Sequence, residues 1–595
     1  MKRFIFSILM MANLAAHQAT ADDERSCLVQ GSPWAHSGGT LYVRGTDNRL
    51  REWRRTLKEE EEQARWYVTD LTSAGCGEIM SDPRYFDEFY FKEIKKRDKE
   101  GNLVLDETGK PVVDGFEIAV IERIVARGKG GQLLECQRRE LFSELFSDPS
   151  TIEEGPTPQW QKSYLTEATG GHIAGTPSPL VSSSFFFDFS GEIFDFSNEN
   201  TPQQFFTPTP DDHLLVWSLP RLSDDTLTLK EDDRIWSVKN LTTNGNRQTS
   251  AGNSNITVPS FLFDDSVYLF TRSQNGHLLL GWQSSEQEQS LIDLTNAVDG
   301  QPKIVGDPAG YGEIFQTAAN RLLGLQYVFA RGTNGHLLAW RHQLEVELEI
   351  PARDSEDYDD WRRQTIETGW NNIMLPDSGW KWKWELLDLT TNVTSGKTIA
   401  GDPTVYTINY PVLDVLNVLA RSSEDHLLKW STVLPIQREG SPSFNEKSEW
   451  KVEDLTVAVG GKQLIKGEPK GIEYLEFPTT IPESDDSPVE KFVIEHSENI
   501  FVTDDNDHLL EWKRQWKEEF DEFEISQPER VVVQEDNWQV TDLTKDCQPA
   551  DGVSGWDENN DEKLDKERLE NVRWCKKQKS DPNKNESEYQ WRCDN

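Results

Sequence analysis

Histidine and aspartate recur at fixed positions along this chain of 595 residues. These side chains can act as metal ligands, or as a general base and its partner. The histidines directly follow a turn signal, and they are His213, His277, His336, His426 and His508. Because each belongs to a separate repeat, the copies should be spread apart rather than gathered. We therefore predict a structural role beside the turn.

An arginine recurs shortly before the turn, and an aspartate recurs in an Asp-Leu-Thr triplet. The arginines are Arg44, Arg127, Arg272, Arg331 and Arg421, and the aspartates are Asp70, Asp293, Asp388, Asp454 and Asp542. Pairing with hydrogen bonds is the usual way to bury either charge. We predict that the two sets pair as structural repeat residues rather than contact a ligand. Pro208 and Thr503 replace the arginine in two units, so the role is not strict.

An enzyme would instead need one asymmetric cluster outside the repeat. The histidines available for it are His172, His342 and His496. The 104 acidic residues are too many for a catalytic carboxylate pair to be chosen. The chain contains no Asp-box, nucleophile elbow, phosphate loop or zinc motif. We therefore predict no catalytic residue, no metal and no cofactor, while leaving enzymatic activity open.

The elements that position these residues come from one repeated stretch. Its clearest copy is YVFARGTNGHLLAW (327–340), followed by WELLDLT (384–390) and IAGDP (399–403). The leucine after the histidine position marks all seven copies: Leu50, Leu133, Leu214, Leu278, Leu337, Leu427 and Leu509. The motif is strict whereas the spacing varies. Repeats of this length indicate a modular fold, with the length differences in loops.

Each copy predicts four short strands. YVFAR is a β-favouring apolar run, Asn334-Gly335 signals a tight turn and HLLAW forms the return strand. WxVxDLT is then a third strand and IxGDP a fourth. Seven such units without a helix signal between them predict an all-β fold, a seven-bladed β-propeller of four-stranded antiparallel blades. The alternative is a two-sheet or two-domain all-β arrangement.

The two ends of the chain suggest how the ring closes. The seventh unit lacks IxGDP after Thr544, while VQGSP at 29–33 fits the missing segment. We predict that this N-terminal strand completes the last blade, which removes an open sheet edge. Residues 1–21 have the pattern of a signal peptide, 22–548 form the propeller and 549–595 are a charged tail. The protein is therefore expected to be secreted or periplasmic, without a membrane span.

The overall charge limits the partners. Without Lys2 and Arg3, the mature chain has 60 basic residues against 104 acidic ones. A surface this acidic disfavours nucleic acid and anionic membranes. It favours solubility, or alternatively the steering of a cationic partner.

Six cysteines in an exported chain make disulfides plausible. A bond between Cys27 and Cys547 would lock the ring, and Cys575 and Cys593 could tie the tail. Cys136 stands where the repeat has tryptophan, and it is equally compatible with a free thiol in the core.

The insertions predict where a ligand binds. In a blade, the first hairpin loop and the loop between strands three and four share one face, and both are short here. The other loops are long and contain surplus aromatic residues: Trp361, Trp370, Trp380, Trp382, Phe186 and Phe189. Aromatic rings can contact the C–H face of a sugar or anchor a protein partner. Alternatively, they fold back onto the ring.

The string VFARGTNGHLLAW resembles the repeats of seven-bladed bacterial lectins of the Photorhabdus type and, more loosely, tectonin-like propellers. The resemblance covers the strand-turn-strand part of each unit, while the DLT and GDP parts depart from it. It implies a secreted propeller that binds glycans, or a cell-surface ligand, at several similar sites. No individual sugar-binding residue can be carried over. The alternatives are a polysaccharide lyase or glycoside hydrolase on the same scaffold, and a protein interaction scaffold.

Overall fold

The computed structural model describes a set of segments separated by gaps. These are residues 27–36, 39–56, 65–96, 103–105, 112–143, 160–166, 172–179, 185–187, 193–195, 203–211, 213–219, 236–241, 255–257, 267–283, 290–316, 321–347, 384–393, 396–409, 414–434, 449–482, 490–520, 531–535, 537–545 and 548–549. The predicted signal peptide and nearly all of the predicted tail lie outside them.

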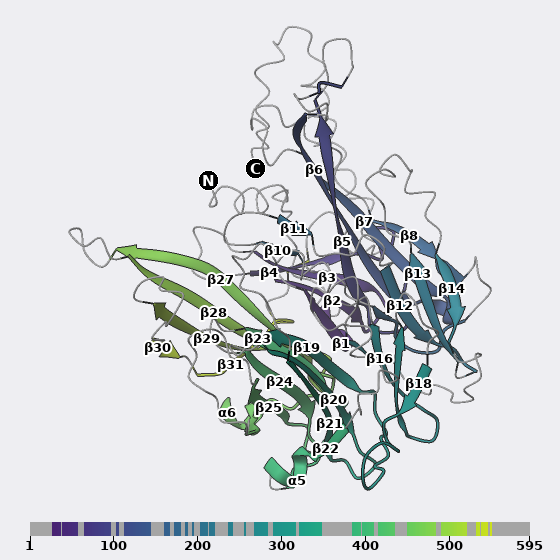
Figure 1. Cartoon of the computed structure of the whole chain (residues 1–595), viewed down its shortest axis with the longest axis vertical. Coiled ribbons are helices and arrows are strands. Elements are labelled where there is room, and N and C mark those ends of the chain that lie inside the picture. The colour runs from purple at the N-terminus through teal and green to yellow at the C-terminus, as the bar shows by residue number, and fades with distance from the viewer. Residues whose placement is uncertain are drawn as a thin grey trace, which may run out of the picture.

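Seven antiparallel sheets follow one another along the chain and form the blades of a β-propeller, as predicted (Figure 1). Blade 1 contains β1 (Val29–His36), β2 (Thr40–Gly45), β3 (Leu50–Thr56) and β4 (Arg65–Asp70). Blade 2 contains β5 (Arg84–Lys95), β6 (Val113–Arg127), β7 (Leu133–Ser143) and β8 (Gln161–Tyr164). Blade 3 contains β9 (Ser178–Pro179), β12 (Gln203–Pro208), β13 (Leu214–Leu219) and β14 (Ser237–Asn240). Blades 4 and 5 contain β15 (Asn255–Thr257), β16 (Val267–Arg272), β17 (Leu278–Gln283) and β18 (Ser290–Asp293), then β19 (Ala309–Gln316), β20 (Arg321–Arg331), β21 (Leu337–Glu347) and β22 (Trp384–Asp388).

Blades 6 and 7 complete the ring. They contain β23 (Thr404–Asn409), β24 (Asp414–Arg421), β25 (Leu427–Val433) and β26 (Lys451–Asp454), then β27 (Lys470–Pro482), β28 (Glu490–Thr503), β29 (Leu509–Phe520), β30 (Val531–Glu535) and β31 (Gln539–Asp542). Outside the blades lie a small hairpin of β10 (Phe185–Phe187) and β11 (Ile193–Asp195), the 3-10 turn η2 (Lys129–Gly131), and β32 (Gln548–Pro549). The described helices are α5 (Leu389–Val393) and α6 (Leu455–Ala458).

The order of strands within a blade differs from the prediction by one position. The strand that follows Gly-Asp-Pro is the innermost strand, the two hairpin strands come next, and the Asp-Leu-Thr strand is outermost. The IxGDP segment adds no fourth strand to its own blade. It forms single bridges to the next hairpin, such as Ile304 with Gly332 and Ile399 with Ser422. The proline of the motif has no N–H, which suits a crossover better than a strand within a sheet.

This strand order also determines how the ring closes. Val29 N donates to Asp507 O of blade 7 at 2.8 Å, as Ile465 N donates to Asp425 O at 2.9 Å. Segment 29–33 is therefore another copy of the motif, but it leads into the innermost strand of blade 1, where β1 pairs with β2. Blade 7 has its own four strands, so the predicted completion of the last blade is corrected. β32 then pairs in parallel with β4, which brings the end of the described chain back to blade 1.

The core lies between the blades. Seven clusters of buried apolar side chains each join two neighbouring blades, and the innermost strands contact one another around the whole ring. The tryptophan of each HLLxW strand is fully buried against the preceding blade: Trp53, Trp217, Trp340, Trp430 and Trp512. Burying such a ring contributes roughly 2–3 kcal/mol.

The two ends of the blades differ. One end holds the tight turns, with α5 and α6 beside them, and we call it the turn end. At the other end, β6 and β28 run to 15 and 14 residues, whereas β12 has six. At about 3.3 Å per residue, the longer strands extend roughly 25–30 Å farther. Figure 1 shows β6 and β27 projecting from the ring, away from α5 and α6.

Candidate functional site

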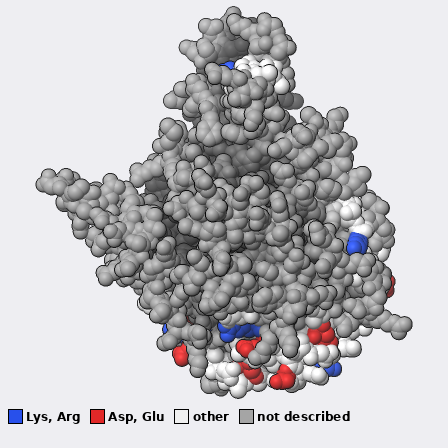
Figure 2. Space-filling view, in the orientation of Figure 1, with Lys and Arg blue, Asp and Glu red and all other residues white. Residues whose placement is uncertain are grey.

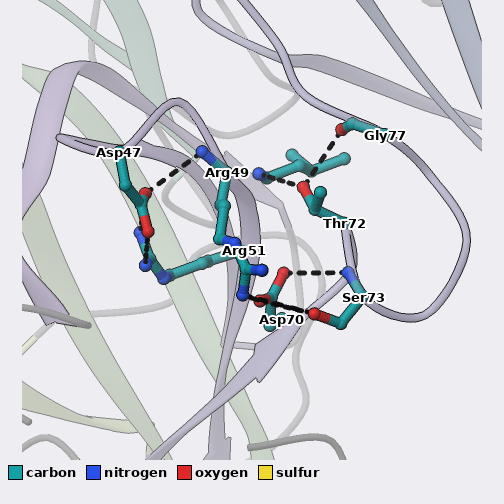
Figure 3. Close-up of polar contacts among 8 residues, drawn as sticks. Asp47, Arg49, Arg51, Asp70, Thr72, Ser73 and Gly77 are labelled. Carbon is teal, nitrogen blue, oxygen red and sulfur yellow. Dashed lines mark hydrogen bonds and ion pairs between the residues drawn. The ribbon is translucent and has the colours of Figure 1, made fainter. Parts of the chain in front are cut away.

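The turn end carries the recurrent polar residues. Figure 3 shows the first copy, where Arg49 occupies the histidine position and contacts Asp70. Ser73 N and Ser73 Oγ donate to the two oxygens of the same carboxylate at 3.2 and 3.0 Å. Thr72 Oγ accepts from Leu50 N at 2.8 Å and donates to Gly77 O at 3.0 Å. The Asp-Leu-Thr triplet thus ties the hairpin to the turn that follows the outermost strand.

In four other blades, the histidine takes the place of Arg49. The Nδ1 to Oδ2 distances are 2.7 Å for His277–Asp293, 2.8 Å for His336–Asp388, and 2.9 Å for His426–Asp454 and His508–Asp542. Because an ionised carboxylate only accepts, Nδ1 of each histidine is the hydrogen-bond donor in these pairs. The predicted pairing is corrected: the aspartate contacts the histidine, not the recurrent arginine.

At two of these aspartates, hydrogen bonds lower the pKa by more than burial raises it. Burial raises the pKa of Asp388 and Asp454, but the bonds from His336 and His426, with those from the following turn, bring each pKa below its usual range. Figure 2 shows both acidic and basic side chains at the lower edge of the molecule, near the turn end.

The recurrent arginines end their strands and interact elsewhere. Arg44 and Arg331 form ion pairs at 3.5 and 3.2 Å with Asp82 and Asp402, the acidic residues that begin the next crossover. Arg127 donates to the carbonyl of Met80 at 3.0 Å. Arg421 contacts Asp425. The pairing of Arg44 with Asp82 could have been predicted from the sequence, because residues 79–83 (IMSDP) are another copy of the IxGDP motif.

Glycine in the motif leaves room for these acids. A Cβ on Gly31 would lie 2.0 Å from Oδ1 of Asp82, and one on Gly306 would lie 1.8 Å from Oδ1 of Asp402. In these two places, the acid of one copy packs against the glycine of the copy one blade before it, which links the two blades.

The histidines considered for catalysis are not brought together. His342 is buried on β21 of blade 5, near the ring of Trp384, and burial lowers its pKa to about 4. His496 is buried on β28 of blade 7 and stacks on Trp516 with ring centres 4.9 Å apart. His172 is exposed near Gly131 at the turn end. Within the described residues, no three histidine, cysteine, aspartate or glutamate side chains converge as a metal site.

A buried charge network joins blades 6 and 7. The Glu498 carboxylate is fully buried, and it contacts Tyr406, Lys429 and Arg514. Burial alone would raise the pKa of Glu498, but the two cations hold it below its usual range. Arg514 also lies over the ring of Trp538 at 5.0 Å. The network links β28 and β29 of blade 7 to β23 and β25 of blade 6.

The predicted ligand-binding aromatics stay untested. Trp361, Trp370, Trp380, Trp382 and Phe189 lie outside the described residues. Phe186 lies in β10 and pairs with Phe194 through the backbone.

The cysteines give a mixed outcome. Cys136 is bonded to Cys76, so it is not a free thiol. This disulfide stands in the cluster between blades 1 and 2, where the other copies have tryptophan. Cys27 is also disulfide-bonded, and its partner lies outside the described residues, as do Cys547, Cys575 and Cys593. The proposed Cys27–Cys547 bond therefore stays a prediction.

Comparison with known proteins yields structural likeness only. No protein-family model matches the chain, and no curated protein matches its sequence. The solved structures that match include AofleA from Arthrobotrys oligospora (10% identity, 79% of this chain and 95% of that one, TM-score 0.30). They also include the WD40 domain of SCAP from fission yeast (11%, 78% and 90%, 0.30) and a fucose-specific lectin from Aleuria aurantia (8%, 91% and 100%, 0.31). Such values carry no inference about a ligand. Among the described residues, no helix is long and apolar enough to cross a membrane.

Proposed function

We propose that the protein is an exported propeller that binds carbohydrate at the end of the blades opposite the short turns. The observation that carries the proposal is the contrast between the two ends. At the turn end, many of the recurrent polar side chains bond to one another within and between neighbouring repeats. At the opposite end, β6, β21 and β28 extend past the common blade length, and the variable insertions begin there.

A rigid ring with variable loops at one end is a common way to present a binding site. Trp370 and Trp380, in the longest insertion, supply flat apolar surface suited to sugar C–H groups. Several weak sites on one ring would add avidity on a multivalent glycan.

A glycan array probed with the mature chain, residues 22–595, tests the proposal. We expect binding to a chemically coherent set of sugars. Trp370→Ala with Trp380→Ala should remove it, and Arg49→His, at the opposite end, should leave it unchanged. A blank array from folded protein would refute carbohydrate binding and favour a protein partner. Release of unsaturated or reducing ends from a polysaccharide would favour a lyase or hydrolase.

A further inference from the structure

Three innermost strands bring together an unusual cluster near the propeller axis. It consists of Trp34 on β1, Asp82 and Arg84 at the start of β5, and Glu468 and Lys470 at the start of β27; we call it the axial cluster. Arg84 Cζ lies 5.0 Å from the centre of the Trp34 ring, and Lys470 Nζ lies 5.5 Å from it. One indole therefore contacts two cations from the two neighbouring blades.

Among the described residues, no carboxylate lies within ion-pair distance of the Lys470 amine. Within the described residues, no hydrogen bond or ion pair involves Lys470 Nζ or the carboxylate of Glu468. Lysines elsewhere in the protein contrast with it: Lys429 contacts Glu498, and Lys466 lies 2.8 Å from Asp507. Lys470 is half-buried, so its amine is partly removed from water and still accessible to it.

The surroundings favour the neutral amine. Burial and, to a smaller extent, the neighbouring Arg84 lower the pKa of Lys470 to about 8 against the opposing charges of Glu468 and Asp82. Burial also raises the pKa of Glu468 to about 8, assisted by Asp402, Asp307 and Asp82 and opposed by Lys470. β23 packs on the other side of β27 and contributes Asp402 through its leading segment. A lysine beside another cation is a recognised form of activated amine nucleophile.

We propose that Lys470 is a nucleophilic amine that binds small aldehydes covalently and reversibly as an imine. The nitrogen lone pair attacks the carbonyl carbon, and the C=O π pair moves to oxygen. A proton moves from nitrogen to that oxygen, which gives a carbinolamine. Glu468 lies two residues before Lys470, in the segment that leads into β27, and its protonated carboxyl can donate to the departing hydroxyl. Water leaves and the C=N bond forms, without an oxidant or a reductant.

The expected rate advantage of Lys470 over an ordinary lysine follows from the fraction of its amine that is deprotonated. At pH 7, an amine with a pKa of about 8 is roughly 300 times more deprotonated than an ordinary lysine. Its lower basicity makes each free amine a weaker nucleophile, so we expect an advantage of roughly tenfold or more. Lys466 is the internal control, since it is exposed, lies on the same segment, and has a pKa raised by Asp507.

The test treats the mature chain with glycolaldehyde and cyanoborohydride at low conversion, followed by peptide mass spectrometry from pH 6 to 11. We expect Lys470 to react at least about tenfold faster than Lys466 at pH 7, with its rate levelling off near pH 8. Arg84→Met should slow Lys470 several-fold at pH 7 but not at pH 11, while Arg84→Lys should preserve the rate. Equal rates at Lys470 and Lys466, or a Lys470 rate that keeps rising past pH 10, would overturn the proposal. The wild-type profile decides the question even if a variant fails to fold.

Discussion

The buried network between blades 6 and 7 yields the sharpest stability prediction. In Glu498→Gln, the side chain keeps its shape but loses its charge. Lys429 then remains buried without a carboxylate partner, while Arg514 retains its contact with the Trp538 ring. Breaking one half of a buried ion pair costs about 3–5 kcal/mol, and the remaining amide oxygen places this variant near 3 kcal/mol.

The pH dependence distinguishes this explanation from a packing defect. The pKa of Glu498 is lowered in the folded protein, so ionised Glu498 favours folding above its unfolded pKa of roughly 4.5. That contribution disappears as the pH falls through the folded pKa. The variant lacks the titrating group, so the difference in stability should be full at pH 7 and should shrink below pH 4.

The assay is reversible denaturant unfolding of wild type and variant between pH 3 and pH 8, followed by tryptophan fluorescence. For a ring of this size, 3 kcal/mol corresponds to a change in Tm of about 3 °C. Lys429→Met is the matched control: combined with Glu498→Gln, it should cost less than the sum of the single changes, because no charge is left unpaired. A constant difference between wild type and variant at every pH would refute the reasoning.

Three further predictions concern contacts between and within blades. Arg49→His should change stability by less than about 0.5 kcal/mol, because four other blades use histidine there, whereas Arg49→Ala should cost about 1 kcal/mol in the same unfolding assay. Gly306→Ala should destabilise the ring by about 1–3 kcal/mol through its clash with Asp402, and Asp402→Ala in the same chain should restore part of the loss. Replacing Cys76 and Cys136 together by serine should cost about 4 kcal/mol, because their bond closes a long loop between two blades. Thermal unfolding with and without reductant checks the last prediction, since reductant should affect the variant less than the wild type.

The turn chemistry could be read directly from the sequence because it is local. Asn334-Gly335 predicted a tight hairpin, and Gly335 has a positive φ of 77°. The residues at the same position in three other hairpins, Asn48, Asp425 and Asp507, have φ angles of 64°, 61° and 65°. Near-continuous apolar strand runs in each repeat indicated sheets buried on both faces, and packing of blades in a propeller buries them in this way. Neither inference requires knowing which distant residue lies nearby.

The partners of charged residues were decided by the tertiary structure. Arg44 and Asp70 belong to the same repeat, and a one-strand difference in blade order decides whether they meet. The sequence fits either order, whereas the ring places Asp82 beside Arg44 and leaves Asp70 to Arg49. Spacing along the chain specifies what a residue can do, and only the packing of neighbouring blades specifies which residue it reaches. The contact of Trp34 with Arg84 and Lys470 joins segments from three blades, so only closure of the ring creates it.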